Sequence, residues 1–525
     1  MRLLRSTLLF SGLTLVSRIA GYVRDVVLAG VFGASSATDA FFIAYRIPNF
    51  LRRIFAEGSF QTAFVPVLTE YKQRGDEAAL RDLLDHTAGA LCAVVLIVTA
   101  LGMLLAPVIA AVFAPGALDE PEKFDLIAQM LRITFPYLWF ISMTALAAAV
   151  LNTYGRFGVP ALTPVLHNLA MICAALFLAP RMGMSIIALA WGVVAAGIAQ
   201  LVAQWIALAR LGVVPRLRLN LRHEGMRRVF RLMLPTIFGS SVAQVNLLVG
   251  TVFASLLATG SQTWLYLTDR LMEFPQGMFG VALATVILPA LSRRVSAGDQ
   301  AGYAATIDWG LRLALLISIP AAAGLIVLAE PLTATLYQYG KFTAFDTAMA
   351  ALALMALAAG LPGFMLAKIL APAFFARQDT RTPVRAALIT VAVNIVLCCA
   401  IVGPLWWYEV SGAHAGIALA TALAGTLNAL LLWRYLRAGA GVRLQPGWPA
   451  FLLRILLAVV VMVALLWLVR RGIGPWTTLA AADRVMHLAW VVPAAVLAYA
   501  LVLLGAGLRP RHLREPLAEK ATPPG

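Results

Sequence analysis

The residues of this sequence best suited to chemistry are charged side chains that interrupt long apolar stretches. They are Arg18, Arg24 and Asp25 in the first stretch, Asp39, Arg46, Asn49, Arg52, Arg53 and Glu57 in the second, and Asp269, Arg270 and Glu273 in a later one. A charge at the centre of a bilayer costs at least about 2.5–3.5 kcal/mol, so such residues usually face water or a partner. Arginine suits phosphate because its planar guanidinium pairs bidentately with the oxygens and stays charged. The pattern predicts a cationic cavity for an anionic ligand.

Helical spacing groups the charges of the second stretch. Arg46, Asn49 and Arg53 stand at i, i+3 and i+7, which places them on one face of a helix. Arg53 can also reach Glu57 one turn further on. For that pair, an ion pair within the protein is the simpler interpretation.

The charges of the other apolar stretches also divide into candidates for the cavity and internal ion pairs. Arg18 and Arg270 lie deep in their apolar runs, which favours a place in the cavity. Glu273 follows Arg270 at i+3, on the same helical face. Arg24 stands directly beside Asp25, and for this pair too the residues alone favour an internal ion pair.

Signatures of enzymes are missing from the sequence. The segment 339–343 (YGKFT) lacks the upstream glycine and the Lys-Ser/Thr ending of a phosphate-binding loop. The six histidines are scattered without metal-type spacing, and no G-x-S-x-G motif is present. We therefore expect a transporter and not an enzyme, with no catalytic residue, no metal and no cofactor. Its driving force would be the membrane potential or an ion gradient, and the coupling ion stays open.

The elements that must hold these charges are transmembrane helices. Of the 525 residues, 61% are hydrophobic and only 12% are charged, whereas a soluble chain carries about 25% charged residues. Segments without any Asp, Glu, Lys or Arg recur along the chain, and several are long enough to cross a bilayer as a helix. The sequence therefore predicts an all-α integral membrane protein with about fourteen transmembrane helices.

Prolines and glycines inside the apolar segments predict bends in several of these helices. They include Pro48, Pro66, Pro235, Pro275, Pro289 and Pro362, with Gly277 and Gly280 close behind Pro275. Membranes tolerate such breaks where protein or water satisfies the freed backbone groups. Bent helices fit a transporter that changes shape, although simple packing kinks are an equal alternative for each residue alone.

Charge in the connecting segments predicts the orientation. The net charge of +17 lies mostly in alternate short connections, among them 72–81, 210–228, 377–385 and 434–443. This placement speaks against nucleic-acid binding and, by the positive-inside rule, puts the basic connections and both termini in the cytoplasm. The connection around Arg470 and Arg471 breaks the pattern.

The chain also repeats itself. Segment 105–116 (LAPVIAAVFAPG) resembles 328–340 (LAEPLTATLYQYG), and Arg46 to Phe50 aligns with Arg270 to Phe274 at an offset of 224 residues. A duplicated unit of six helices has an even helix count, so its two copies are parallel. The prediction is an N-lobe at 1–228, a C-lobe at 229–440, and two further helices with a cytoplasmic tail at 441–525. Two-lobed transporters bind substrate between their repeats.

Several long motifs along the chain resemble the MurJ/MviN family of lipid II flippases. In the first lobe they are Ser17-Arg18, Arg24-Asp25, Thr38-Asp39-Ala40-Phe41-Phe42, Pro48-Asn49, Arg52-Arg53 and Phe55-Ala56-Glu57-Gly58. In the second they are Asp269-Arg270, Glu273-Phe274-Pro275, Gln338-Tyr339-Gly340-Lys341-Phe342-Thr343 and Arg377-Gln378-Asp379-Thr380-Arg381-Thr382-Pro383.

The resemblance implies export of lipid II from the inner to the outer leaflet of the cytoplasmic membrane for cell-wall synthesis. It implies two six-helix lobes of the multidrug/oligosaccharidyl-lipid/polysaccharide exporter superfamily, two C-terminal helices beside the lipid tail, and alternating access. The implied partners are lipid II and membrane lipids, and we expect a monomer. The implied substrate-binding residues are Arg18, Arg24, Asp39, Asn49, Arg52, Arg53, Arg270 and Glu273, with Asp39 and Glu273 as acidic partners of the arginines.

Other functions remain open at this point. A cation-coupled drug exporter of the same superfamily would need an acidic, aromatic cavity, which the arginines speak against. A flippase for polysaccharide repeat units would use similar chemistry without the long motifs. A membrane-embedded glycosyltransferase would need carboxylates in an outer connection, and only the acidic segment 114–128 offers them.

Overall fold

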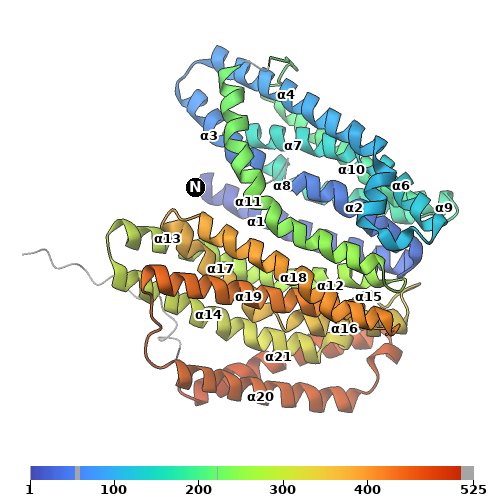
Figure 1. Cartoon of the computed structure of the whole chain (residues 1–525), viewed down its shortest axis with the longest axis vertical. Coiled ribbons are helices and arrows are strands. Elements are labelled where there is room, and N and C mark those ends of the chain that lie inside the picture. Colours follow the sequence, from blue (N-terminus) through green and yellow to red (C-terminus); the bar gives the residue numbers. More distant parts are fainter. Residues whose placement is uncertain (1, 54–58, 221–222, 510–525) are drawn as a thin grey trace, which may run out of the picture. The chain divides into compact units, whose positions relative to one another are not determined.

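The computed structural model of this chain describes residues 2–53, 59–220 and 223–509, and every regular element in them is helical (Figure 1). The first elements are α1 (Arg2–Phe32), α2 (Ser36–Arg52), α3 (Ser59–Gln73), α4 (Glu77–Leu104), α5 (Ala106–Phe113), α6 (Pro121–Thr134), α7 (Pro136–Thr153), α8 (Gly158–Cys173), α9 (Ala179–Arg181), α10 (Ile187–Arg210) and α11 (Glu224–Ser255). The later ones are α12 (Ser261–Pro275), α13 (Val281–Ser296), α14 (Gln300–Val327), α15 (Ala329–Tyr337), α16 (Ala344–Ala358), α17 (Leu361–Ala376), α18 (Arg381–Trp407), α19 (His414–Ala440), α20 (Trp448–Ile473) and α21 (Ala481–Gly505).

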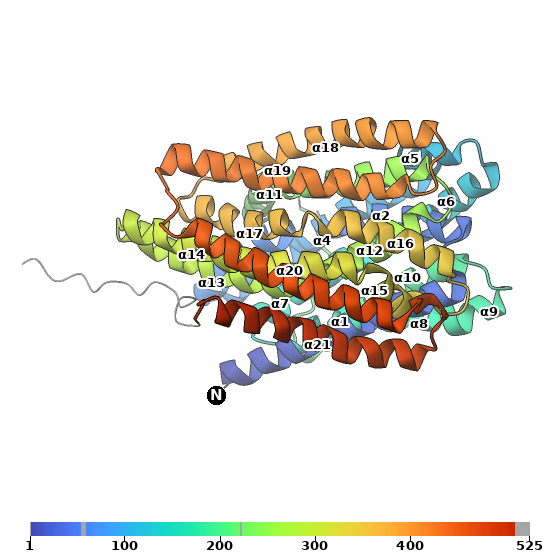
Figure 2. The same ribbon diagram turned by 90° about the horizontal axis from the view of Figure 1, so that it is seen from below.

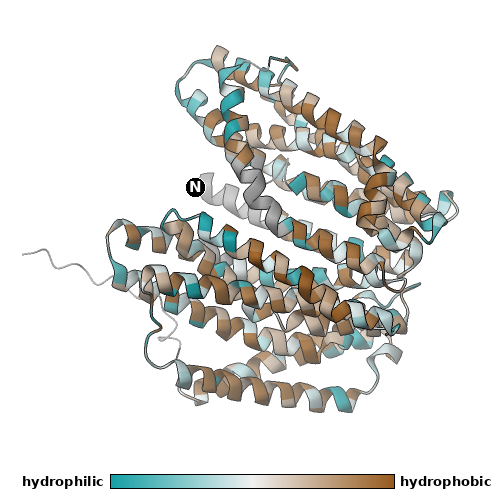
Figure 3. Cartoon of the chain, in the orientation of Figure 1, coloured by the Kyte–Doolittle hydropathy of each residue, from teal (hydrophilic) through white to brown (hydrophobic). Residues whose placement is uncertain are grey.

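Many of these helices suit a bilayer. Within the described residues, 10 helical segments are long and apolar enough to span one, or 11 when α16 and α17 count as one span bent by 43°. Hydrophobic residues colour most of the length of the helices, and hydrophilic residues gather toward the connections (Figure 3). The all-α membrane fold is confirmed, whereas the number fourteen stays a prediction.

Large apolar side chains on the outer helices point away from the protein. On α20, Leu453, Val460 and Leu468 are each more than 60% exposed, although the helix is held by a buried face that includes Ile455 and Leu466. A soluble protein rarely leaves contiguous apolar surface of this kind uncovered. In a bilayer, lipid tails cover such an apolar face, so it is not exposed to water.

The two segments whose similarity predicts a repeat follow helices that begin alike. Both α4 and α14 have 28 residues, and both are preceded by an N-cap aspartate, Asp76 and Asp299. Each of these carboxylates accepts hydrogen bonds from backbone N–H groups of the first turn. For Asp299, the hydrogen bonds from Gly302 and Arg294 hold the carboxyl pKa below its ordinary value. The two helices therefore begin in the same way.

The two helices also end alike. Leu105 after α4 has φ −87° and ψ 9°, and Leu328 after α14 has φ −95° and ψ 13°. At each leucine a short second helix begins, with Pro107 in the first turn of α5 and Pro331 in that of α15. Proline cannot continue an α-helix without losing a hydrogen bond, so it restarts the helix after the break. The repeated motif is thus a broken membrane helix.

Helix packing divides the chain into two units. The first comprises Met1–Thr263 together with Tyr339–Phe342, and the second comprises Trp264–Gln338 and Thr343–Gly525. The packing places α11 in the first unit, against α3, α2 and α4. This boundary lies one helix later than the lobe boundary that the repeat predicts at residue 229. The two duplicated lobes stay a prediction.

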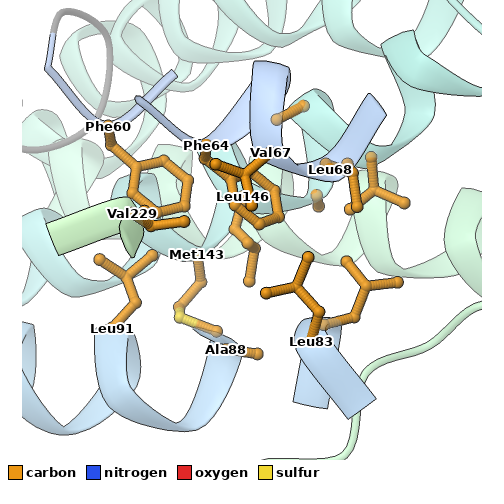
Figure 4. Packing of buried hydrophobic residues seen from close by; sticks show 14 of the residues in the cluster. Phe60, Phe64, Val67, Leu68, Leu83, Ala88, Leu91, Met143, Leu146 and Val229 are labelled. Atoms are coloured by element: carbon orange, nitrogen blue, oxygen red, sulfur yellow. The ribbon is translucent and has the colours of Figure 1, made fainter. Parts of the chain in front are cut away.

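In the first unit, one apolar cluster joins α3, α4, α7 and α11. It contains Phe60 and Phe64 of α3, Leu83 of α4, Met143 of α7 and Val229 of α11, all at most 2% exposed (Figure 4). A fully buried large side chain stabilises a fold by about 1.5–3 kcal/mol in water. The cluster fixes the beginning of α11 against α4.

In the second unit, α20 and α21 lie side by side and pack on α14 (Figure 2). The buried carboxylate of Asp308 on α14 accepts hydrogen bonds from Gln445, Trp448 and Arg312, so it anchors the segment before α20. The buried guanidinium of Arg484 on α21 donates to backbone carbonyl groups at the end of α15. Cations stabilise helix C-termini because the last carbonyl groups carry partial negative charge.

Segment Tyr339–Phe342 returns to the first unit, where it packs against the end of α1. The Lys341 N–H donates to the Gly30 carbonyl oxygen at 2.8 Å. Gly340 has φ +56°, and a Cβ atom there would lie 2.3 Å from the same carbonyl oxygen. Only glycine combines this backbone conformation with so close an approach.

Replacing Gly340 by alanine is expected to lower the melting temperature of the purified protein more than replacing Gly441 does. Both glycines have positive φ, and Gly441 has open space around it. The left-handed conformation costs alanine about 1–2 kcal/mol at either position, and only Gly340→Ala adds a backbone clash. Thermal unfolding in detergent measures both variants. Equal shifts would show that the contact with Gly30 does not constrain the segment.

Candidate functional site

The charges of α1 have different surroundings. Arg18 is exposed, and no hydrogen bond or ion pair links its side chain to another described residue. Arg24 is only 6% exposed, and its Nε and Nη2 donate to Asp25 Oδ1 at 2.9 and 2.6 Å. The ion pair that the residues favoured for Arg24 is therefore present. Its role in substrate binding stays a prediction.

Helix α8 joins α1 to α2 through two adjacent polar residues. Asn168 accepts a hydrogen bond from Arg24 Nη1 at 3.2 Å and donates to the Ser17 carbonyl oxygen at 3.1 Å. His167 Nε2 lies 3.0 Å from the Tyr45 hydroxyl of α2. The sequence analysis missed all three side chains, although a buried His-Asn pair within an apolar segment is itself an unusual signal.

The polar face predicted for α2 is present. Asn49 Oδ1 accepts a hydrogen bond from Arg52 Nε at 2.8 Å, which orients that guanidinium. Arg46 donates to the Thr251 hydroxyl of α11 at 2.8 Å, and Arg53 donates to Gln244 of α11 at 3.2 Å. These half-buried arginines thus contact neutral partners on the neighbouring helix.

Glu57, the predicted partner of Arg53, lies outside the described residues. The predicted Arg53–Glu57 ion pair therefore has no structural counterpart to compare. Arg53 itself lies at the C-terminal end of α2, where its backbone N–H donates to the Asn49 and Phe50 carbonyl groups.

Asp39 has partners other than those the resemblance implied. Its buried carboxylate accepts hydrogen bonds from Gly260 N–H at 2.7 Å, from Thr263 N–H at 2.9 Å and from the Thr263 hydroxyl at 2.7 Å. No arginine lies among these partners, because the carboxylate is occupied by the free N–H groups at the start of α12. A carboxylate at a helix N-terminus satisfies orphan donors and complements the helix dipole. The contact joins residues 224 apart, the offset that also relates Arg46 to Arg270.

In the second unit, Arg270 and Glu273 are paired as their spacing predicts. Arg270 Nη1 lies 2.6 Å from Glu273 Oε2, and their side chains are 30% and 57% exposed. The guanidinium also lies over the Tyr266 ring, 6.0 Å from its centroid. This exposed pair keeps access to solvent, and surface ion pairs of this kind exchange partners at little cost.

A break in the helix follows directly. The helix changes after Pro275 into a π-helical turn, Gln276–Gly280, which contains both predicted glycines. Lys368 of α17 donates from Nζ to the Gln276 carbonyl oxygen at 2.9 Å. Such turns free carbonyl groups from the helical ladder, and they occur frequently at functional sites.

Two of the motifs that carry the resemblance have structural roles. In 338–343, Thr343 caps α16 through a reciprocal pair of hydrogen bonds with Asp346. In 377–383, the Asp379 carboxylate accepts hydrogen bonds from the Thr382 hydroxyl and from the N–H groups of Thr382 and Arg381. These bonds, led by that of the Thr382 hydroxyl, hold the carboxyl pKa below its ordinary value. Both motifs start a helix.

The candidate residues of each unit suit the binding of an anion. Exposed Arg18 and partly exposed Arg270 offer guanidinium groups to an anion, whereas Arg24 and Asp39 are buried among polar partners. Among the candidate site residues, none combines a nucleophile with an adjacent base. Phosphate-rich ligands match such arginines in charge and geometry.

Comparison with known proteins gives a consistent family match. A family model described as lipid II flippase MurJ matches residues 28–486. A probable lipid II flippase MurJ of Vibrio cholerae is 43% identical over 98% of this chain and 98% of its own length. A lipid II flippase MurJ of Burkholderia cenocepacia is 41% identical over 89% of this chain and 90% of its own.

Solved structures give the same result for the fold. A lipid II flippase MurJ in an inward closed conformation superposes with a TM-score of 0.77 at 27% identity, covering 94% of this chain and 98% of that one. An inward-facing multidrug transporter of the MATE family superposes with a TM-score of 0.62 at 12% identity, covering 82% and 98%. The second likeness concerns the fold alone.

Proposed function

This chain belongs to the MurJ family of lipid II flippases, and we propose that it moves lipid II from the inner to the outer leaflet of the cytoplasmic membrane. The observation that carries the proposal is the 43% identity over 98% of both chains. The drug exporters share the fold at much lower identity, and the cationic helices α1 and α2 suit an anionic headgroup instead.

The proposed substrate contacts are made by the diphosphate of lipid II. Exposed Arg18 and partly exposed Arg270 bind its oxygens directly, and Arg24, Arg52 and Arg53 add positive charge. Support comes from the chemistry of the guanidinium group, which pairs bidentately with phosphate. Asn49 holds Arg52 in place. Asp39 acts by positioning α12, and Glu273 by pairing with Arg270 until substrate replaces it.

Alternating access is the proposed mechanism, and it requires helices that bend. Support comes from the breaks after α4 and α14, the 43° bend between α16 and α17, and the π-helical turn after Pro275. The headgroup enters from the inner leaflet, the arginines neutralise it, and rearrangement exposes it on the outer side. The isoprenoid chain stays in lipid throughout.

The proposed energy source is the membrane potential or an ion gradient. Moving one elementary charge through 100 mV is worth about 2.3 kcal/mol, so a cationic site responds to the potential. Both termini are proposed to lie in the cytoplasm, because the basic connections lie on their side of the membrane. The protein is proposed to work as a monomer, with lipid II and membrane lipids as its partners.

Expression of this chain is expected to rescue a bacterium depleted of its own lipid II flippase. The reason is that the near-full-length similarity includes both lobes and the cationic helices. Growth measures rescue, and outer-leaflet lipid II is measured with a labelling enzyme that cannot cross the membrane. The empty vector provides the baseline. A well-expressed chain that restores neither growth nor labelling would overturn the proposal and favour the polysaccharide-exporter alternative.

A further inference from the structure

Three side chains with metal-binding chemistry meet in the first unit, where the start of α4 lies beside the start of α11. Asp82 and His86 lie one turn apart near the start of α4, and His223 is the N-cap residue of α11. Each offers one ligand atom, and the three atoms lie within 4.8 Å of one another. We propose that Asp82, His86 and His223 bind a divalent transition-metal ion of the zinc class. The proposal is independent of lipid transport.

The distances suit such an ion. His86 Nδ1 lies 3.2 Å from Asp82 Oδ1, and His223 Nε2 lies 3.2 Å from Asp82 Oδ2. Zinc binds imidazole nitrogen and carboxylate oxygen at about 2.0–2.2 Å, so neighbouring ligand atoms of a tetrahedral site lie about 3.4 Å apart. Each histidine nitrogen therefore lies at about this distance from one oxygen of the Asp82 carboxylate, His86 from Oδ1 and His223 from Oδ2. A small rotation of the carboxylate and of the rings would bring one oxygen and both nitrogens around an ion.

The two rings are held in place without a metal. They stack at 4.9 Å between centroids with an interplanar angle of 13°. His223 Nδ1 accepts the Met226 N–H at 3.2 Å, which leaves Nε2 facing Asp82. His86 Nδ1 lies 2.8 Å from the Asp82 carbonyl oxygen, and an ion bound to this nitrogen would replace that contact. A metal on His223 Nε2 would replace a proton and leave the helix cap intact.

The surrounding backbone is equally fixed. The Arg216 N–H donates to Asp85 Oδ1 at 2.7 Å, and the Arg218 N–H donates to the Asp85 carbonyl oxygen at 3.2 Å. A Cβ atom on Gly89 would lie 2.1 Å from the Arg218 carbonyl oxygen, so this connection runs directly over α4. The site therefore needs little ordering when an ion binds, and preorganisation favours affinity.

Two of the nearby arginines are paired with carboxylates other than Asp82. Arg218 Nε lies 3.7 Å from Asp85 Oδ2, and Arg228 Nη1 lies 2.7 Å from Glu70 Oε2. The Asp82 side chain is 46% exposed, whereas those of His86 and His223 are 12% and 15% exposed. The carboxylate side is therefore open to an incoming ion and to water as a fourth ligand. Two imidazoles and one carboxylate form a donor set that suits zinc and excludes magnesium or calcium.

The consequence is a bridge between α4 and the start of α11. Both helices belong to the first unit, and the Leu83 and Val229 side chains already share its apolar cluster (Figure 4). An ion bound to His223 and to the α4 pair would add a direct link across the connection that leads into α11. By the positive-inside rule, the basic connection before α11 lies in the cytoplasm, and the ion would come from that side.

Zinc titration of the tag-free, full-length protein in detergent tests the proposal. Isothermal titration calorimetry is expected to show one zinc ion per chain. His86→Ala and His223→Ser are each expected to weaken binding by about tenfold or more, since each removes a ligand. Serine keeps the cap of α11 because it is among the best N-cap residues. Zinc is also expected to raise the melting temperature of the wild type and not of the variants.

His487→Ala provides the matched control. Asp483 and His487 on α21 repeat the Asp-x-x-x-His spacing, and His487 Nδ1 lies 2.6 Å from the Asp483 carbonyl oxygen. In the described part of the chain, this pair belongs to no group of three metal-ligating side chains. Unchanged zinc binding by His487→Ala supports the site. Equal zinc uptake by the wild type and by the His86→Ala, His223→Ser double variant would overturn it.

Discussion

Arg18→Ala and Arg270→Ala are each expected to abolish rescue of a flippase-depleted bacterium at wild-type membrane abundance. Arg18 is exposed, and Arg270 is partly exposed beside the exposed carboxylate of Glu273, so both reach solvent. Bonds between arginine and phosphate are charge-assisted and about twice as strong as neutral hydrogen bonds. Each loss would weaken binding of the diphosphate. Growth after depletion and outer-leaflet lipid II measure the effect.

Controls separate substrate binding from structure. Arg74→Ala removes an exposed arginine paired with Glu70 at i−4, much as Arg270 is paired with Glu273, and it is expected to rescue fully. Arg18→Lys keeps the charge but loses the planar fork, so partial rescue is expected. Full rescue by both alanine variants would show that neither arginine is needed for the substrate.

Asp39→Ala is expected to produce the largest loss of stability among substitutions of the candidate site residues. The variant leaves the N–H groups of Gly260 and Thr263 without their buried carboxylate acceptor. Hydrogen bonds to a charged group contribute about 1.5–3 kcal/mol each, so the expected loss is about 3 kcal/mol or more. The melting temperature in detergent and the abundance in membranes measure it.

Asp76→Ala is the matched control for Asp39. Asp76 accepts hydrogen bonds from Ala78 and Ala79 at the start of α4, where it is exposed to solvent. Water replaces an exposed acceptor, and loss of such a cap costs about 1 kcal/mol. Asp39→Asn keeps one acceptor oxygen and should fall between the two. Equal shifts for Asp39→Ala and Asp76→Ala would contradict the capping role of Asp39.

Local pattern predicted much of the fold. Apolar length predicted membrane helices. The similar segments 105–116 and 328–340 both stand where a long helix ends and a shorter one begins, whereas the duplication itself stays a prediction. Proline and glycine spacing predicted the break after Pro275. These features depend on one segment at a time, so the sequence contains all the information needed.

Spacing along one helix also predicted the Arg270–Glu273 pair, and chain adjacency predicted Arg24 beside Asp25. Hydrogen bonds between residues that lie far apart in the chain could not be predicted from spacing. Asn168 beside Arg24 and Thr251 beside Arg46 are separated from their arginines by 144 and 205 residues. A hydrogen bond across such a distance depends on how helices pack, which hydropathy does not specify.

Asp39 and His223 show most clearly that spacing along the chain does not predict contacts between helices. Composition, apolar length and local motifs were enough to identify a helical membrane protein with cationic segments and the motifs of a lipid II flippase family. Helix packing, in contrast, brings Asp39 to the start of α12 and brings His223 against Asp82 and His86, the latter 137 residues earlier in the chain. A carboxylate or imidazole takes its role from the groups packed around it, and here those groups come from other helices.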